Sequence, residues 1–259
     1  MCPVSIVSKD ANFAAASVGY DLPVADAAWE YLGFYGTAYG ADCLTRNLVS
    51  GKPSAQVVGA PPLSTYYATF TGAAHYLQTA VEHVDGMTVF AIAEAIGDTT
   101  GAPLISNNGS VSQDLDPVSS NGIMLYLRTG AAADDDSVRP ALQQAIQSGG
   151  VSTASGLIAQ APETPLTDTP ALFVGRAQSG AKPAIRDWTN AESDTLATNT
   201  VTTIDLGQEL RIGSQYNDVI ADAVRIHCAG IISEVVSDAD MATIYARLSA
   251  HMTRRSITI

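Results

Sequence analysis

The sequence predicts an all-β protein, an antiparallel β-sandwich or barrel. Short β-type runs alternate with turn clusters such as Gly97–Gly101, Asn107-Asn108-Gly109 and Asn121-Gly122. Many short strands with this punctuation are typical of antiparallel sheets. The helical stretches of 10–15 residues that a parallel α/β sheet places between its strands are missing from the pattern. We therefore expect an antiparallel core with few helices.

Residues 1–62 differ in composition from the rest and end in Gly59-Ala60-Pro61-Pro62, which indicates a linker. We expect a domain boundary here, with an anchoring or oligomerisation segment over 1–62 and a β domain over 63–259. Aromatic side chains are enriched at protein interfaces. One hypothesis is therefore that an aromatic cluster in this segment docks on another subunit or a partner protein. The alternative is a local core beneath the sandwich. The cluster comprises Trp29, Tyr31, Phe34, Tyr35 and Tyr39.

The predicted strands follow in order. They span Tyr66–Phe70, Ala74–Thr79, Met87–Ile96, Gly122–Thr129, Ala171–Gln178, Thr200–Leu206 and Glu209–Gly213, and Ala223–Val236 holds one long strand or two short ones.

A helix is well specified after the last strand. Ser237 can cap it, and Asp238 and Asp240 favour its positive end. Met241, Ile244, Tyr245 and Leu248 then form one apolar stripe at helical spacing. A shorter helix is expected from Ser137 through Ile146.

Charge and cysteine content exclude several classes of function. The chain has 13 basic and 26 acidic residues, a net charge of −13, so it lacks the cationic surface that nucleic acids or anionic membranes require. No apolar run approaches the ~20 residues of a membrane helix, so no membrane insertion is expected. We see no secretory signal at the start of the sequence. Three scattered cysteines fit synthesis in a reducing cytosol.

Three motifs carry a family resemblance between Thr69 and Leu248. They are Phe70-Thr71-Gly72 with the following His75-Tyr76-Leu77, then Leu210-Arg211-Ile212-Gly213, and then Ala229–Val236 before the helix. In order and spacing the chain resembles the concanavalin A-like lectin/glucanase superfamily, in particular its laminin G-like and pentraxin-like jelly rolls. The resemblance implies an antiparallel β-sandwich jelly roll with a short C-terminal helix, and it says little about activity.

Jelly rolls of this family often bind glycans or mediate adhesion, including in bacteriophage tail and surface proteins. The resemblance therefore implies a non-enzymatic attachment or structural protein of a phage virion, made in the bacterial cytoplasm. Its partners would be other virion proteins or further copies of itself, and host-surface glycan. The rivals are a polysaccharide hydrolase or lyase on the same fold, and a structural decoration or baseplate protein that binds no sugar.

The enzymatic alternative depends on an E-x-D-x-x-E strand, which carries the carboxylates of the family's glycoside hydrolases. Glu192-Ser193-Asp194 supplies the first two carboxylates, but Ala197 stands where the acid should be. Hydrolysis needs two carboxylates that flank the scissile bond. We therefore expect no catalytic residues of this type.

No cofactor or metal is expected. The four histidines lack ligand spacing, and adjacent His227 and Cys228 should point to opposite faces of a strand. Calcium is the weaker alternative, because Asp134-Asp135-Asp136, Asp114 with Asp116, and Asn217-Asp218 are rich in oxygen ligands. None of these has an EF-hand spacing.

Sugar recognition generally uses an aromatic ring beside polar groups. Trp188, flanked by Arg186, Asp187 and Asn190, is the best such constellation in the sequence. We take these four residues as candidate glycan contacts. The alternative is that Trp188 fills the core or the base of a loop.

Overall fold

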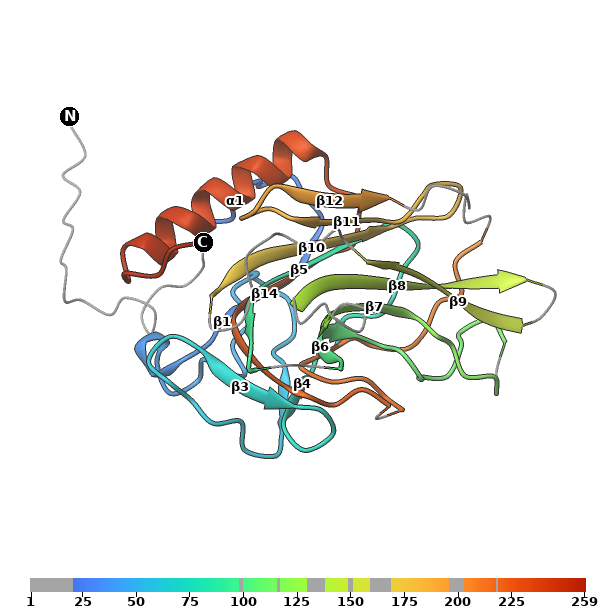
Figure 1. The fold of residues 1–259 in the computed structure, drawn as a ribbon, viewed down its shortest axis with the longest axis horizontal. Coiled ribbons are helices and arrows are strands. Elements are labelled where there is room, and N and C mark those ends of the chain that lie inside the picture. Colours follow the sequence, from blue (N-terminus) through green and yellow to red (C-terminus); the bar gives the residue numbers. More distant parts are fainter. Residues whose placement is uncertain are drawn as a thin grey trace.

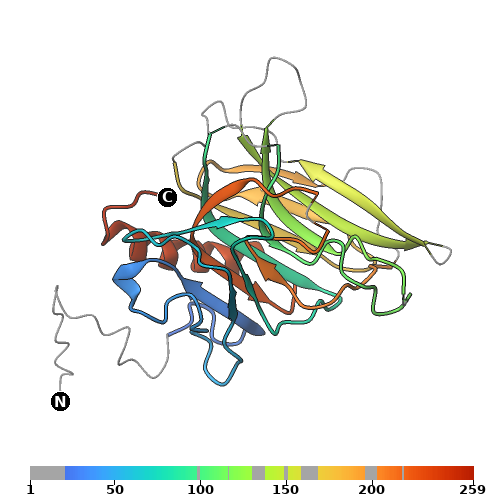
Figure 2. The same ribbon diagram turned by 90° about the horizontal axis from the view of Figure 1, so that it is seen from below.

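The computed structural model describes residues 21–97, 100–115, 117–129, 138–148, 151–158, 169–195, 203–217 and 219–259. Two seven-stranded antiparallel sheets face one another, with one long helix on the outside (Figures 1 and 2). The expected all-β sandwich with a C-terminal helix is confirmed. None of the described helices is long and apolar enough to cross a membrane.

The first sheet, called sheet A, lies next to the helix. Its order is β1 (Trp29–Phe34), β14 (Ala223–Ile232), β5 (Met87–Ala95), β10 (Ala171–Ala177), β11 (Ala184–Asp187) and β12 (Glu192–Thr195), and β3 (Ala68–Thr71) also pairs with β14.

The second sheet, called sheet B, forms the opposite layer. Its order is β2 (Gln56–Val58), β4 (Tyr76–Gln78), β13 (Arg211–Ile212), β6 (Ala102–Ser106), β7 (Ile123–Thr129), β8 (Val138–Ser148) and β9 (Val151–Ile158).

Strand β5 explains how the two hydrophobic cores are built. Val89 and Ala91 point into the core between the sheets, whereas Phe90 and Ile92 point into a second core beneath the helix. Successive side chains of a strand face opposite ways, so a strand covered on both sides reads as a continuous apolar run. Gly230 on β14 is required here, because a Cβ would lie 2.1 Å from Cζ of Phe90.

Helix α1 (Asp238–Thr253) closes the second core. Ser237 is its N-cap, and the side-chain Oγ accepts a hydrogen bond from Asp240 N at 3.1 Å. Met241, Ile244 and Leu248 are buried along one side, as the sequence predicts. The apolar stripe packs on the outer face of sheet A, where the ribbon shows α1 lying along the sheet (Figure 1).

The shorter helix expected from Ser137 is wrong, since Val138–Ser148 is strand β8. Val138, Pro140 and Leu142 share one buried face of this strand, a period of two that competes with the helical spacing of Leu142 and Ile146. Pro140 is tolerated there although it donates no hydrogen bond.

The division at residue 62 does not separate two structural units within residues 21–259. Strand β1 pairs with β14 in sheet A, and β2 pairs with β4 in sheet B. Each sheet therefore takes a strand from before the expected boundary. The described part of the N-terminal segment belongs to the sandwich.

The expectation that the N-terminal aromatic cluster docks on a partner is corrected for the same reason. The side chains lie inside the chain's own cores, so the alternative of a core position is the one observed. Their exposures are 4% for Trp29, 0% for Tyr31, 4% for Phe34, 0% for Tyr35 and 5% for Tyr39.

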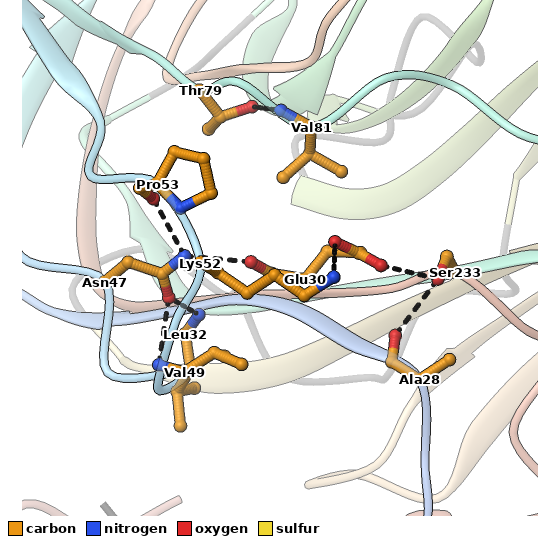
Figure 3. A network of polar contacts seen from close by, with 10 residues as sticks. All are labelled: Ala28, Glu30, Leu32, Asn47, Val49, Lys52, Pro53, Thr79, Val81 and Ser233. Atoms are coloured by element: carbon orange, nitrogen blue, oxygen red, sulfur yellow. Dashed lines mark hydrogen bonds and ion pairs between the residues drawn. The ribbon is translucent and has the colours of Figure 1, made fainter. Parts of the chain in front are cut away.

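A polar network joins the loop that contains Asn47 and Lys52 to β1, and joins β1 to Ser233, which follows β14 (Figure 3). Asn47 donates to Glu30 O at 2.8 Å and to Pro53 O at 3.0 Å, and its Oδ1 accepts from a backbone N–H of β1. The Glu30 carboxylate accepts from Ser233 Oγ at 2.9 Å and pairs with Lys52 Nζ at 2.6 Å. These bonds satisfy polar groups that the fold would otherwise leave unpaired.

Candidate functional site

The sequence-predicted Trp188 constellation lies beside the start of helix α1. Trp188 is half-buried and packs against the second core, with its ring centroid 6.2 Å from that of Tyr245. The Arg186 guanidinium lies 4.0 Å from the Trp188 ring centroid and 3.6 Å from an Asp238 oxygen. Arg176 donates to the other oxygen of Asp238. These contacts attach α1 to sheet A and cover much of the indole that was expected to serve as a sugar platform.

Asp187 and Asn190 shape the turn after β11. Asp187 is fully buried, and its Oδ1 accepts from the backbone N–H groups of Thr189 and Asn190, both at 3.0 Å. Asn190 Nδ2 donates to Asp187 Oδ2 at 2.8 Å. This is a side-chain-supported turn of the kind that aspartate favours. Both residues use these polar groups within the chain.

The other sequence motifs for chemistry are partly placed. Glu192 and Asp194 lie on the edge strand β12, and Ala197 falls outside the described residues. Asp114 and Asn217 are exposed, whereas Asp134–Asp136, Asp116 and Asp218 fall outside the described residues. Among the residues that are described, no group of three His, Cys, Asp or Glu side chains could hold a metal ion.

A different set of side chains gathers on the outer face of sheet B. Leu77 on β4 and Ile212 on β13 are fully buried in the core between the sheets. Their neighbours Tyr76, Gln78 and Arg211 therefore point outward, because side chains alternate along a strand. Gln78 and Arg211 are direct partners across the two strands, so they share this face.

Arg211 is the centre of this group. Its guanidinium carbon lies 3.5 Å from the ring centroid of Tyr216 and 4.6 Å from that of Tyr76. Both distances fall within the range of a cation–π contact. Nε donates to Gln78 Oε1 at 2.9 Å, and Nη1 donates to the backbone oxygen of Gln215 at 3.0 Å. We call Tyr76, Gln78, Arg211 and Tyr216 the Arg211 cluster.

Tyr216 is fixed in position by its hydroxyl. The hydroxyl donates to Glu209 O at 2.9 Å and receives a hydrogen bond from Gln78 Nε2 at 3.1 Å. Burial raises the pKa of Tyr216 above its ordinary value, and hydrogen bonding to Gln78 and the Arg211 charge oppose this rise. The hydroxyl is therefore neutral at physiological pH, and the ring is held against Arg211.

The cluster joins the components that sugar recognition requires. All four side chains are half-buried, so each keeps part of its surface in solvent. Two aromatic rings offer surfaces on which a sugar ring can stack, and the guanidinium offers hydrogen-bond donors for hydroxyls. The Gln78 amide bonds to Thr79, Tyr216 and Arg211, and so holds the cluster in place. The arrangement can bind a polar ligand through its two rings and the guanidinium.

A second polar cluster lies on the outer face of sheet A. Glu94 on β5 and His227 on β14 are both buried, with His227 Nε2 at 3.7 Å from Glu94 Oε1. Arg225 Nη1 lies 3.4 Å from the same oxygen. The Tyr67 ring packs against the His227 ring at 5.4 Å. Neither ring nitrogen of His227 has a hydrogen-bond partner among the described residues. We call Glu94, His227, Arg225 and Tyr67 the Glu94 cluster.

Sequence reasoning missed the Arg211 cluster although the motif Leu210-Arg211-Ile212-Gly213 was recognised as a strand. The alternation Leu210, Ile212 around a single arginine was the available signal, because it places Arg211 on the outer face. The tyrosines come from other segments, Tyr76 from β4 and Tyr216 from the loop after β13. The pairing of β4 with β13 brings Tyr76 and Arg211 together, and the hydrogen bonds of the Tyr216 hydroxyl hold the loop against them.

No protein-family model and no curated protein matches the sequence. Solved structures do match the fold. The receptor-binding domain of botulinum neurotoxin mosaic serotype C/D, with tetraethylene glycol and sulfate bound, has a TM-score of 0.56 at 12% identity, over 85% of this chain and 51% of that chain. The Trypanosoma rangeli sialidase in complex with sialic acid has a TM-score of 0.54 at 12% identity, over 86% of this chain and 33% of that chain.

The botulinum neurotoxin serotype D binding domain gives a similar match, with a TM-score of 0.55 at 10% identity. It covers 85% of this chain and 52% of that chain, so this chain spans about half the length of the neurotoxin domains that it matches. At such low identity the likeness concerns architecture. The chain has the β-sandwich fold that these toxin domains and the sialidase contain.

Proposed function

We propose that the protein is a non-enzymatic glycan-binding module that holds sugar on the outer face of sheet B. The observation that carries the proposal is the Arg211 cluster, in which one guanidinium lies against the rings of both Tyr76 and Tyr216. Sugars are bound through ring stacking together with hydrogen bonds to hydroxyls, and this cluster offers both. The ordered hydroxyl of Tyr216 and the fixed amide of Gln78 reduce the entropy lost on binding.

The comparisons support the glycan-binding part of the proposal. Among the matching structures is one titled for the cell entry of botulinum neurotoxin type C and its dependence on two ganglioside molecules, with a TM-score of 0.50 over 75% of this chain and 47% of that chain. A sialidase complex with sialic acid is another. Proteins with this sandwich therefore occur in glycan recognition.

The biological setting is a further part of the proposal. We propose attachment to a host-surface glycan from a bacteriophage virion, with other virion proteins or copies of this chain as partners. The sequence resemblance to jelly rolls of phage tail and surface proteins is its support.

A binding screen with paired variants tests the function. The wild-type protein, Tyr76→Ala and Tyr67→Ala are compared on an array of bacterial and animal glycans. Both tyrosines are half-buried, but Tyr67 packs on His227 of sheet A, so Tyr67→Ala compares the Glu94 cluster with the Arg211 cluster. Losing a stacking ring should cost about 1–3 kcal/mol, a tenfold or larger loss of affinity, in Tyr76→Ala alone.

Two outcomes would contradict the proposal. A wild-type protein that binds no glycan supports the structural decoration or baseplate role. Binding that survives in Tyr76→Ala but fails in Tyr67→Ala would move the site to sheet A.

The Glu94 cluster favours a second candidate, a polysaccharide hydrolase or lyase. A buried carboxylate beside an imidazole can transfer protons. The cluster contains one carboxylate, however, and most glycoside hydrolases use two. Incubating host polysaccharide with wild type and Glu94→Gln separates the roles. Release of reducing or unsaturated ends by wild type alone would establish the enzyme, and their absence from both agrees with binding only.

A further inference from the structure

Arg211 differs from half of the ten arginines in its electrostatic partners. Five arginines form ion pairs with carboxylates, namely Arg46, Arg176, Arg186, Arg225 and Arg247. Arg211 makes no ion pair with any described carboxylate, and its bonds go to an amide oxygen and a backbone oxygen. In a chain with 26 acidic and 13 basic residues, Arg211 thus holds a half-buried positive charge that no described carboxylate neutralises by direct contact.

The surroundings of Arg211 keep this charge available. The Tyr76 and Tyr216 rings shield the guanidinium in part from water, which strengthens its interaction with an anion. A guanidinium carries five N–H donors, and its hydrogen-bond partners in the described chain are Gln78 Oε1, Gln215 O and the Tyr216 hydroxyl. Donors therefore remain for an external acceptor. The planar fork suits a carboxylate, which it can bind through two parallel hydrogen bonds.

We propose that the ligand of the Arg211 cluster is an acidic glycan, one whose carboxylate pairs with the Arg211 guanidinium while its sugar ring stacks on Tyr76 or Tyr216. This inference rests on the proposed function and adds the chemical class of the ligand. Gln78 holds Nε, so the outer edge of the guanidinium is turned to the carboxylate. The charge also explains how an acidic protein can bind an anion, because the attraction is local.

Glu209 makes a second, opposite contribution. It lies two residues before Arg211 and is half-buried. Its negative charge raises the pKa of the Tyr216 hydroxyl, as burial also does, so the carboxylate lies close to the cluster. An acidic ligand would meet the same charge. Removing it should strengthen binding of the acid and leave a neutral ligand unchanged.

The experiment uses isothermal titration of the wild-type protein with sialyllactose and with trigalacturonate, each measured against its methyl ester. Esterification removes the charge and keeps the ring, so the comparison needs no variant. We expect at least tenfold weaker binding of the ester for at least one of the two sugars, since hydrogen bonds to charged groups are the stronger class. The affinity for the acid should fall as salt rises from 50 mM to 500 mM.

Three variants locate the effect. Arg211→Gln should lose tenfold or more for the acid and change little for its ester. Glu209→Gln should bind the acid about two- to threefold more tightly, as expected for removing one screened like charge. Arg247→Gln is the matched control, because it removes a positive charge from helix α1, where Arg247 pairs with Asp21 at 2.8 Å.

The outcomes separate the two proposals. Equal affinity of wild type for acid and ester would overturn the acidic ligand and leave glycan binding in place. An absence of binding to every glycan, acidic or neutral, overturns both. Loss of acid binding in Arg247→Gln as large as in Arg211→Gln would also overturn the inference, since net charge and not the cluster would then be responsible.

Discussion

Trp29 and Phe90 meet edge to face, with ring centroids 5.9 Å apart and ring planes at 88°. Trp29 belongs to β1 and Phe90 to β5, so the contact joins the N-terminal segment to the middle of sheet A across β14. Edge-to-face pairs contribute beyond the area that they bury. The segment is thus part of the packing that holds α1 on the sheet.

Trp29→Ala should lower the free energy of unfolding by about 3–5 kcal/mol, as is typical when a buried aromatic is truncated. Trp29 Nε1 also donates to Val24 O at 2.8 Å, and that bond is lost too. Urea denaturation followed by circular dichroism measures the change. Val219→Ala is the control, because Val219 is 78% exposed and should unfold like wild type. An unchanged stability with a changed oligomeric state would restore the docking role of this segment.

His83 makes stability depend on pH. It is buried, its Nδ1 accepts from Gly207 N at 3.2 Å, and burial lowers its pKa from 6.5 to about 4. The unfolded chain therefore binds a proton at a higher pH than the folded chain does. The contribution of His83 is present above pH 6.5 and is lost as pH falls toward 4.

The loss from this group alone should be about 3 kcal/mol, from 1.36 kcal/mol for each pKa unit. His83→Asn keeps an acceptor for Gly207 N and removes the titrating group. Its stability should vary less than that of wild type between pH 6.5 and 4, measured by urea denaturation at each pH. His251 adds a dependence in the same direction, since burial lowers its pKa to about 3. Identical slopes for wild type and His83→Asn would contradict the assignment.

Asp238 contributes to stability in acid through its pair with Arg176. The hydrogen bond from Arg176 lowers the pKa of Asp238 below its ordinary value. The carboxylate therefore stabilises the fold above the unfolded pKa of about 3.9, and this contribution is lost as pH falls through the lower folded value. Asp238 is largely exposed, so Asp238→Asn should cost about 1 kcal/mol or less at pH 7. The difference from wild type should shrink in 1 M salt.

The elements that could be predicted from the sequence carry strong local signals. Helix α1 begins at a capping serine and continues with one apolar stripe. All nine residues of strand β5 are buried and seven of them are apolar, because both of its faces are covered. Strand β1 gave no such signal. Five of its six residues are buried, so it lacks the alternation of apolar and polar residues, and its glycine and three aromatics do not form a continuous aliphatic run. Its character as a strand depends on pairing with β14, far along the chain.

The candidate site was harder to predict than the fold. Trp188 with its polar neighbours satisfies the local requirement for sugar binding, but helix α1 arrives over it from a segment 50 residues later. The Arg211 cluster has no local signature because Tyr76, Arg211 and Tyr216 belong to separate segments. Contacts between distant parts of the chain decide which side chains are covered and which stay accessible.

Trp188 and Arg211 can be separated by experiment. Trp188→Ala removes a half-buried ring that packs on Tyr245 and carries the Arg186 guanidinium, so it should lower stability by about 2–4 kcal/mol. It should leave glycan affinity unchanged under conditions where the variant is folded, because the ring lies on sheet A and the Arg211 cluster lies on sheet B.

Arg211→Gln should affect glycan affinity more than stability. Arg211 is half-exposed and has no carboxylate partner in the described chain, so losing its ring contacts and hydrogen bonds should cost about 1–2 kcal/mol of stability, while acid-glycan affinity falls tenfold or more. Urea denaturation and titration on the same preparations give both values for each variant. If Trp188→Ala stays stable and loses glycan binding while Arg211→Gln keeps it, the sugar binds beside α1 as the sequence first indicated.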